Sequence, residues 1–320
     1  MPEPLPSWQH DEVGALQGFA RVRLIVADLD GTLVLPTSDE LSHMIQALNR
    51  KLASPAQHVI FTIATGRALA GITPLLNQLR LRPNIPVAAY NGSLVLLPQK
   101  RLPLHEAAIP REAFRELLKL ASAVNVPTLA YVFDSSPRAE EFFESPGEKV
   151  YGWHIQGGQD RELNGLTITR SVLPDLPDEV EAIAVLLDVR ELSASAAGHV
   201  RAELEGVQGL SVTQSSTSYL EIRPVGANKA TAISIIAASL NIDRADVLTI
   251  GDNDNDAEML QWAGIGVAVA GASAAALQSS RYYCRHGVER GVVEVLRTVR
   301  QAKRFHGFLL GDDAVPVGGL

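Results

Sequence analysis

Cysteine is almost absent from this 320-residue sequence, and Cys284 is its single example. One cysteine excludes a disulfide bond within the chain and a metal site built on several thiolates. The eight histidines are scattered and form no pair at the spacing of metal ligands. Any bound metal is therefore expected to be a hard cation held by oxygen atoms, with Mg²⁺ as the first candidate.

Long apolar runs and surplus positive charge are missing as well. No run reaches the roughly 18–20 residues that a membrane-spanning helix needs, and the first 19 residues lack the basic start and apolar core of a signal peptide. The net charge of −8 disfavours nucleic acid and anionic membranes as partners. We therefore expect a soluble, cytoplasmic protein in which local positive groups hold any phosphate-bearing substrate.

The rest of the composition is that of an ordinary globular protein, with 46% hydrophobic and 20% charged residues, and the length suits two domains or one core with a large insertion. Apolar, β-prone runs over residues 24–27, 59–64 and 86–90 begin three strand–loop–helix units, with helices expected over 39–52 and 68–79. Such units predict an α/β fold with a parallel sheet and crossover helices. The pattern returns late in the chain, where we expect helices over 228–240, 256–263 and 291–303 and strands over 247–250 and 265–270.

Between these two stretches the pattern changes. Residues 112–124 and 194–204 have helical spacing, residues 128–133, 182–187, 210–214 and 219–222 are β-prone, and residues 134–165 show no clear period. We expect an α+β insertion of about 125 residues, which is large enough to form a domain. The predicted limits are an extension outside the fold over 1–20, a core over 21–92 and 219–303, an inserted domain over 93–218 and a loose tail over 304–320.

Two carboxylates follow the first apolar run at once. Asp28 and Asp30 are two residues apart, so strand geometry would turn both side chains toward one point beyond the strand's end. Ligands of open α/β sheets sit at that edge, and two acids there repel each other unless they share a cation or a proton. The alternative is a plain strand followed by an Asx-type turn with Gly31.

Two polar turns follow the next apolar runs. Thr65-Gly66-Arg67 stands between a predicted strand and a predicted helix, where a Thr hydroxyl and free helical N–H groups can hold a phosphate oxygen. Ordinary helix capping by Thr65 explains the same residues. Asn91-Gly92 ends the third run, and a simple turn accounts for it on local grounds.

Lys229 lies in the first turn of a helix that Asn228 is placed to cap. A cation there opposes the helix dipole by roughly 0.3–1 kcal/mol. The position makes sense if an anion binds at this helix start, although an exposed lysine can also be merely solvated.

Residues 251–256, Gly-Asp-Asn-Asp-Asn-Asp, directly follow an apolar strand. One acid or amide at a helix start is normal capping, but five consecutive polar groups exceed that need. An oxygen-rich cluster at the end of a buried strand suits Mg²⁺, which takes carboxylates together with water and substrate oxygens.

These motifs occur in a fixed order: DLDGTL at 28–33, TGR at 65–67, VGANK at 225–229 and GDNDND at 251–256. The sequence thereby resembles the haloacid-dehalogenase-like superfamily of phosphatases, and it is most similar to the Cof-type branch, subclass IIB. YNGS at 90–93, YLEIRPVGANK at 219–229, GDNDNDAEML at 251–260 and GVERGVVEVL at 287–296 fit that branch in particular. The resemblance implies a Rossmann-like doubly wound parallel core with an inserted α+β cap domain of the C2B type. The chain departs from the family at Lys229-Ala230, usually Lys-Gly, and at 271–273, where Gly-Ala-Ser replaces a common Gly-Asn-Ala.

The resemblance also implies the roles of the residues. Asp28 would be the nucleophile that forms an aspartyl-phosphate, and Asp30 would be the general acid and base. The Mg²⁺ ligands would be Asp28, the backbone carbonyl of Asp30, Asp252 and Asp256. Phosphate binding falls to Thr65, Gly66, Lys229 and Asn255, while Arg67, Asn91, Gly92 and Asn253 are expected beside the substrate or behind these groups.

The expected substrate is a small phosphate monoester, with sugar phosphates as the first class by resemblance. A sugar phosphomutase or phosphotransferase would use the same aspartyl-phosphate, and a non-catalytic ligand-binding module would keep the same scaffold. The five intact residues Asp28, Asp30, Lys229, Asp252 and Asp256 argue against the non-catalytic reading. The sequence leaves the oligomeric state open.

Overall fold

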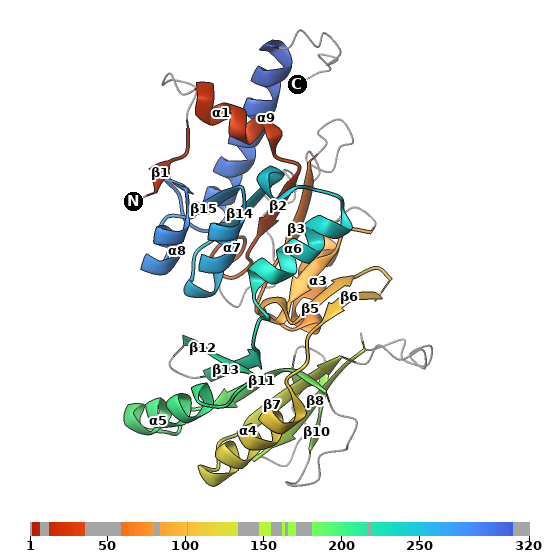
Figure 1. Ribbon diagram of the computed structural model, residues 1–320, viewed down its shortest axis with the longest axis vertical. Helices are drawn as coiled ribbons and strands as arrows, with labels where there is room; N and C mark the ends of the chain where they lie inside the picture. Colours follow the sequence, from red (N-terminus) through yellow and green to blue (C-terminus); the bar gives the residue numbers. More distant parts are fainter. Residues whose placement is uncertain are drawn as a thin grey trace. The chain divides into compact units, whose positions relative to one another are not determined.

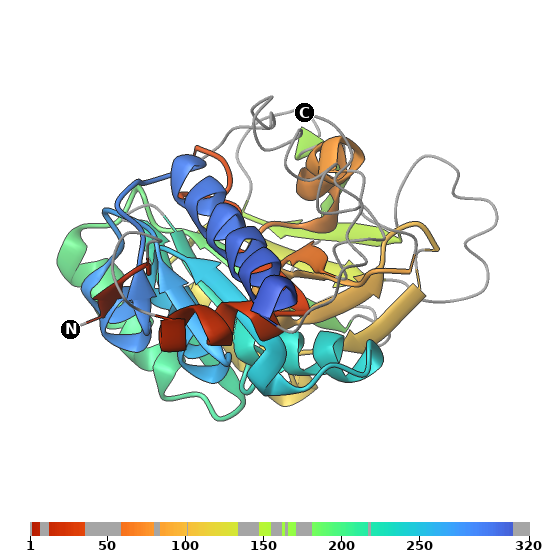
Figure 2. The same ribbon diagram turned by 90° about the horizontal axis from the view of Figure 1, so that it is seen from above.

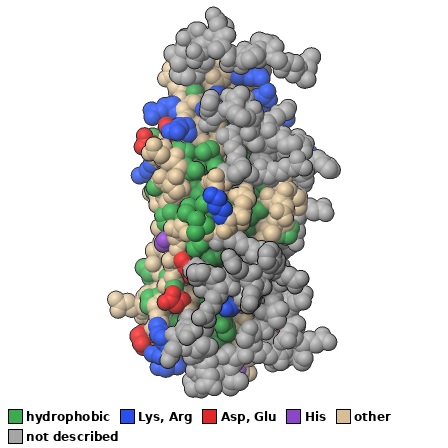
Figure 3. Space-filling model, turned by 90° about the vertical axis from the view of Figure 1, so that its right-hand side faces the viewer, with side chains coloured by type: hydrophobic (Ala, Val, Ile, Leu, Met, Phe, Trp, Pro, Cys, Tyr) green, Lys and Arg blue, Asp and Glu red, His purple; other side chains and the backbone are tan. Residues whose placement is uncertain are grey.

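The computed structural model describes residues 2–6, 13–35, 59–79, 84–100, 102–133, 147–154, 162–163, 166–170, 181–216 and 219–309. The chain divides into two compact units. The first comprises Met1–Ala64, Leu75–Ile85 and Ile236–Leu320, and the second comprises Thr65–Pro74 and Pro86–Ile235. None of the helices in the described part is both long and apolar enough to cross a lipid bilayer. Figure 3 shows Lys and Arg side chains scattered in small groups over the described part of one face.

The described part of the first unit contains a parallel six-stranded sheet in the order β1-β16-β15-β14-β2-β3 (Figure 1). Its strands are β1 (Glu3–Pro4), β2 (Leu24–Ala27), β3 (Ile60–Ile63), β14 (Val247–Gly251), β15 (Ile265–Ala268) and β16 (Tyr282–Tyr283). Every residue of β2, β14 and β15 is buried, as expected for short apolar strands inside a parallel sheet. The predicted α/β class with a parallel core sheet is confirmed.

Helices accompany these strands in the first unit. They are α1 (Val13–Arg21), α7 (Ala257–Trp262), α8 (Ala274–Ser279) and α9 (Arg290–Leu309), with the short 3₁₀ helices η4 (Arg244–Asp246) and η5 (Asp254–Asp256) between them. α1 packs against α9 (Figure 2), and the ammonium of Lys303 donates to the Ala20 carbonyl at 2.9 Å. Two helices cross between the units along the chain: α3 (Leu69–Leu79), which continues through Pro74, and α6 (Lys229–Ser239).

The amino-terminal residues were expected to lie outside the fold, and that prediction is wrong for the described ones. β1 pairs in parallel with β16, and Phe19 of α1 is completely buried with its ring 5.2 Å from that of Tyr282. The amphipathic α1 gains its stability from this packing. At the other end, α9 runs to Leu309, so the predicted tail begins later than residue 304.

The second unit contains a seven-stranded sheet in the order β12-β13-β11-β7-β8-β10-β9. Its strands are β7 (Thr128–Phe133), β8 (Glu148–Trp153), β9 (Glu162–Leu163), β10 (Leu166–Arg170), β11 (Ala182–Asp188), β12 (Leu210–Ser216) and β13 (Tyr219–Pro224). All neighbours are antiparallel except β8 and β10. α4 (Arg111–Ala123) and α5 (Ala194–Glu205) share one apolar core with this sheet, in which Phe114 meets Trp153 edge to face. The expected α+β insertion thus forms, with Trp153 as a packing residue.

A small antiparallel sheet, β4-β5-β6, completes the described part of the second unit. It consists of β4 (Val87–Ala89), β5 (Leu94–Leu97) and β6 (Leu102–Glu106). The third apolar run was counted among the strands of the parallel sheet, and this prediction is wrong, because β4 pairs with β5 instead. Tyr90, Asn91 and Gly92 of η2 (Tyr90–Gly92) all have positive φ and reverse the chain immediately after β4. The predicted helix over residues 39–52 lies outside the described residues.

Candidate active site

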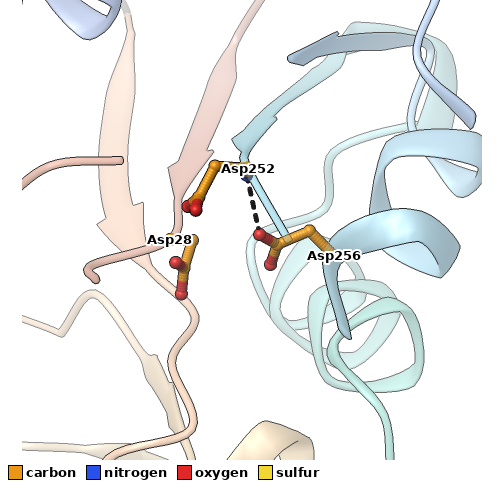
Figure 4. Close-up of side chains that lie close together, drawn as sticks. All are labelled: Asp28, Asp252 and Asp256. Atoms are coloured by element: carbon orange, nitrogen blue, oxygen red, sulfur yellow. Dashed lines mark hydrogen bonds between the residues drawn. The ribbon is translucent and has the colours of Figure 1, made fainter. Parts of the chain in front are cut away.

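The two acidic motifs of the first unit meet at the carboxyl ends of adjacent strands. β2 and β14 are paired in parallel with Ala27 opposite Ile250, and the N–H of Asp28 donates to the Ile250 carbonyl at 2.9 Å. Asp28 therefore leaves β2 at the level where Asp252 leaves β14. One carboxylate oxygen each of Asp28, Asp252 and Asp256 lies within 4.8 Å of the others (Figure 4).

Asp252 is held in place by the loop that follows Asp28. The Thr32 hydroxyl, itself fully buried, donates to Asp252 Oδ1 at 2.7 Å. Gly31 has φ +86°, and a Cβ there would stand 2.7 Å from the Asp252 carboxyl carbon. Only glycine allows this approach without strain. The Ser273 N–H adds a bond to the Asp252 carbonyl at 2.7 Å, so the Gly-Ala-Ser departure from the family pattern still supports this residue through its backbone.

Asp256 is completely buried, and its position is fixed by the start of its own helix. Its Oδ2 accepts the N–H groups of Asp252 at 2.9 Å and Asn253 at 3.0 Å. Asn253 completes a reciprocal capping box, and Gly251 leaves the space that the Asp256 side chain fills. A carboxylate removed from water needs such donors. Asn255 is half-buried beside it, and its predicted part in phosphate binding remains a prediction.

Asp30 lies two residues beyond Asp28 and forms a bridge with Val34. Backbone hydrogen bonds from Gly31 to Val34 and from Val34 to Leu29, both 2.9 Å, close the turn around it. Its half-buried side chain is not among the three carboxylates that converge in the described residues. The roles of Asp30 as acid, base and metal ligand through its backbone carbonyl stay predictions.

The three converging carboxylates form a donor set that fits a hard divalent cation. All three ligands are oxygen atoms, Asp28 is 4% exposed and Asp256 is 0% exposed. Three like charges gathered in a largely buried place repel one another, and a cation between them removes that repulsion. Carboxylate oxygens are the ligands that Mg²⁺ and Ca²⁺ prefer. The residues present therefore suit a metal site.

The other predicted residues gather in the second unit. Thr65 is 1% exposed; its N–H donates to Ala88, and its carbonyl accepts the N–H of Asn91 at 2.9 Å. Gly66 lies against the Asn91 side chain, because a Cβ on Gly66 would stand 3.0 Å from Asn91 Nδ2. The Asn91 amide donates to Glu221 at 3.1 Å. The turns at 65–67 and 91–92 are thus neighbours, although 26 positions separate Thr65 from Asn91 in the sequence.

Lys229 joins this group through Gly92. A Cβ on Gly92 would stand 2.6 Å from the Asn228 carbonyl carbon, so the turn passes directly over the start of α6. Asn228 caps α6 as predicted, because its Oδ1 accepts the Thr231 N–H at 2.7 Å. Lys229 is 1% exposed in the first helical turn. A cation in that place opposes the helix dipole.

A buried carboxylate that the sequence did not reveal is Glu148 of β8. This 3%-exposed carboxylate accepts the N–H groups of Leu69 at 2.5 Å and Ala70 at 2.7 Å, and the hydroxyl of Tyr90 at 2.5 Å. Free N–H groups at the start of this helix were expected to face phosphate, and for these two residues that prediction is wrong. Burial raises the pKa of Glu148, while the three hydrogen bonds oppose the rise. Burial and the nearby Glu148 carboxylate raise the pKa of Tyr90.

A pocket of about 190 Å³ opens within the second unit. Its polar lining comprises Arg67, Asn91, Glu221 and Arg223, and Tyr131 adds an aromatic face. Burial raises the pKa of Tyr131 to about 12. Two guanidinium groups, a carboxylate and an amide give the pocket both hydrogen-bond donors and acceptors.

A family model for haloacid dehalogenase-like hydrolases matches residues 25–296. The match spans the strand before Asp28, the second unit and the motif around Asp252. The chain belongs to the haloacid dehalogenase-like hydrolase family and is an enzyme of that hydrolase class.

Individual relatives agree with this placement. The 5-amino-6-(5-phospho-D-ribitylamino)uracil phosphatase YitU of Bacillus subtilis is 26% identical over 285 residues, covering 86% of this chain and 96% of the relative. A haloacid dehalogenase-like hydrolase from Bacteroides thetaiotaomicron, solved by crystallography, is 26% identical with a TM-score of 0.67, covering 87% of this chain and 99% of its own. The subclass IIB sugar phosphatase BT4131 shares the fold at 15% identity, with a TM-score of 0.62 over 89% of this chain and 99% of its own. The predicted resemblance to Cof-type, subclass IIB phosphatases is confirmed.

Proposed function

We propose that the protein is a Mg²⁺-dependent phosphatase that hydrolyses small phosphate monoesters through an aspartyl-phosphate on Asp28. The observation that carries this proposal is the convergence of Asp28, Asp252 and Asp256 at the ends of β2 and β14. Three acidic groups gathered in a largely buried place are costly for folding alone, and membership of a hydrolase family supports a hydrolytic use for them.

The reaction proceeds in two steps. An oxygen of the Asp28 carboxylate attacks phosphorus, the ester P–O bond breaks, and Asp30 gives its proton to the leaving oxygen. Asp30 then takes a proton from water, whose oxygen attacks phosphorus, releasing phosphate and restoring the Asp28 carboxylate. Asp28, the Asp30 carbonyl, Asp252 and Asp256 would hold Mg²⁺, which when bound neutralises phosphoryl charge.

Charge on the equatorial phosphoryl oxygens must also be met by protein donors. We assign this to Thr65, Gly66, Lys229 and Asn255. Its position supports Lys229: it is buried in the first turn of α6, where a bound phosphate would offset the unfavourable interaction with the helix dipole. Thr65 accepts the Arg67 N–H at 3.1 Å, which leaves its hydroxyl proton available for an acceptor.

The substrates fitting this proposal are phosphorylated sugars or polyols. The relative YitU is a phosphatase for a phosphoribitylamino compound, and BT4131 is a sugar phosphatase. The polar pocket that includes Arg67, Glu221 and Arg223 has donors and acceptors suited to hydroxyl groups.

The test is a screen of phosphorylated metabolites with Mg²⁺, with released inorganic phosphate as the readout and Asp28→Asn as the matched inactive protein. Release by the wild type and none by Asp28→Asn supports the proposal. Equal release by both proteins would rule out the assignment of Asp28. Adding an acceptor sugar and finding a phosphorylated sugar in place of phosphate would reassign the reaction to phosphotransfer.

A further inference from the structure

The carboxylate of Glu148 has no part in the proposed reaction, yet it is buried and accepts several hydrogen bonds within the second unit. It stands in β8 opposite Phe133 of β7 and accepts three hydrogen bonds of 2.5–2.7 Å. These three donors are two consecutive backbone N–H groups and one phenol, contributed by segments 58 to 79 positions earlier in the chain.

Two of these donors belong to the amino end of α3. The first turn of this helix contains no acidic residue of its own. Helix amino ends favour a negative charge by about 0.3–1 kcal/mol when exposed and more when partly buried. Glu148 supplies that charge from a strand, and its carboxylate satisfies N–H groups that the helix itself leaves without partners.

The third donor closes a ring of contacts around the turn before α3. The Tyr90 hydroxyl donates to Glu148, while the Tyr90 backbone N–H donates to the Arg67 carbonyl at 3.1 Å. Glu148 in turn accepts the Leu69 N–H, two residues beyond Arg67. The segment from Arg67 to Leu69 is therefore fixed at both ends through Tyr90 and Glu148.

This ring orients the Thr65 hydroxyl. The Arg67 N–H donates to Thr65 Oγ1 at 3.1 Å, so the direction left for the hydroxyl proton depends on where Arg67 lies. The same backbone segment places the Arg67 guanidinium at the polar pocket. A shift of the amino end of α3 would displace both groups together.

We propose that Glu148 is a positioning residue for phosphoryl binding: it anchors the amino end of α3 so that Thr65 and Arg67 keep the orientation that the reaction needs. The inference rests on the proposed function. It assigns Glu148 no contact with substrate. Its effect reaches the phosphoryl group through Leu69, Ala70 and the turn at residues 65–67.

The test compares Glu148→Gln with wild type and with Glu181→Gln, a control at an exposed glutamate of the same unit. Glutamine keeps the size, but its amide nitrogen cannot accept an N–H bond. We expect kcat to fall roughly 10–100-fold, as small misplacements of reacting groups do, with a far smaller change in KM. Glu181→Gln should match wild type.

Two readouts separate positioning from general destabilisation. The Mg²⁺-induced rise in melting temperature reports on the carboxylates of the first unit and should persist in Glu148→Gln. Competitive inhibition by inorganic phosphate should weaken only as much as KM rises, because both report ground-state binding of the phosphoryl group. Wild-type kcat and phosphate inhibition in a folded Glu148→Gln would overturn the inference while leaving the proposed function intact.

Tyr90→Phe gives an independent test, because it removes one donor and keeps the carboxylate. We expect kcat to fall in this variant as well, but by less than in Glu148→Gln. If Glu148→Gln does not fold, this variant decides alone, and wild-type kcat in Tyr90→Phe overturns the inference. Failure of the proposed function itself looks different, since the wild type would then hydrolyse no phosphate ester, with no difference from Asp28→Asn.

Discussion

Asp256 and Glu148 are the same kind of group in two different settings. Each is a buried carboxylate that accepts two backbone N–H bonds at the start of a helix. Asp256 takes its donors from residues three and four positions before it, and it shares its surroundings with Asp28 and Asp252. Glu148 takes its donors from a distant segment and meets the neutral hydroxyl of Tyr90.

The difference between these two sites lies in how the negative charge of each buried carboxylate is balanced. For Glu148, backbone N–H groups and a phenol O–H replace water that the carboxylate loses on burial. Three carboxylates within 4.8 Å of one another add mutual repulsion that hydrogen bonds do not cancel. Glu148 therefore links distant segments of the second unit, whereas the acidic triad of the first unit is a donor set that could hold a metal ion.

The largest expected effect comes from removing the proposed nucleophile. Asp28→Asn should lower phosphatase turnover by roughly 10⁴-fold or more, because the amide keeps the shape but cannot attack phosphorus. Steady-state kinetics with a substrate from the screen measures the loss. Asp243→Asn, at an exposed position of the same unit, should retain wild-type turnover. Comparable losses in both variants would contradict a special role for Asp28.

Metal binding should distinguish the acidic triad of the first unit from the Glu148 carboxylate, because only the triad is proposed to bind Mg²⁺. Saturating Mg²⁺ should raise the free energy of unfolding by ~2–3 kcal/mol at a concentration 100 times its Kd, which calorimetry reads as an upward shift in melting temperature. Asp252→Asn should remove the shift, and Asp254→Asn, at the exposed neighbour, should keep it. Mg²⁺ that leaves the wild-type melting temperature unchanged would exclude the proposed site.

The close approach of Gly31 to Asp252 gives a smaller and more specific effect. Gly31→Ala adds a Cβ against the Asp252 carboxylate and places alanine at φ +86°. Gly271→Ala is the matched control, because Gly271 has φ +87° with nothing within 4 Å of the added Cβ. Both should lose ~1–2 kcal/mol from the backbone, and only Gly31→Ala should also lose Mg²⁺ affinity and turnover. Equal behaviour of the two variants would show that the loop tolerates the contact.

The smallest expected effect is a pH dependence of stability due to Glu148. Burial raises the pKa of Glu148 in the folded state above its ordinary value of 4.5. Between those two values the folded state binds more protons than the unfolded state, so stability from this group falls as pH rises through the window. Relative to Glu148→Gln, the wild type should therefore lose stability from about pH 4.5 upward.

Urea unfolding at several pH values measures this difference, with Glu181→Gln as the parallel control. A gap between wild type and Glu148→Gln that is independent of pH would mean that Glu148 keeps its ordinary pKa in the folded protein.

The sequence predicted most of what depends on local signals. Asp28 and Asp252 each follow a short apolar strand, and parallel pairing brings such strand ends together, so their convergence could be anticipated. The capping of α6 by Asn228 was readable in the same way. The strands of the insertion that had clear β-prone runs, such as β7 and β11, also form as expected.

What the sequence did not predict depends on contacts between distant segments. Glu148 lies in a stretch without a clear period, and its donors are more than 50 positions away. The β4 run looks the same whether it pairs in a parallel or an antiparallel sheet, and the positive φ values at residues 90–92 decided the matter. The amino-terminal proline-containing stretch showed no sign that Phe19 packs on Tyr282.

The two-residue strand β1 has a practical consequence for handling the protein. It covers the outer side of β16, and so brief an edge offers few unpaired backbone groups to another molecule. Cutting the chain back to residue 7 or beyond would leave Tyr282 and Tyr283 at the border of the sheet, with their N–H and C=O groups open to intermolecular pairing. Versions shortened in this way would therefore be more prone to aggregate.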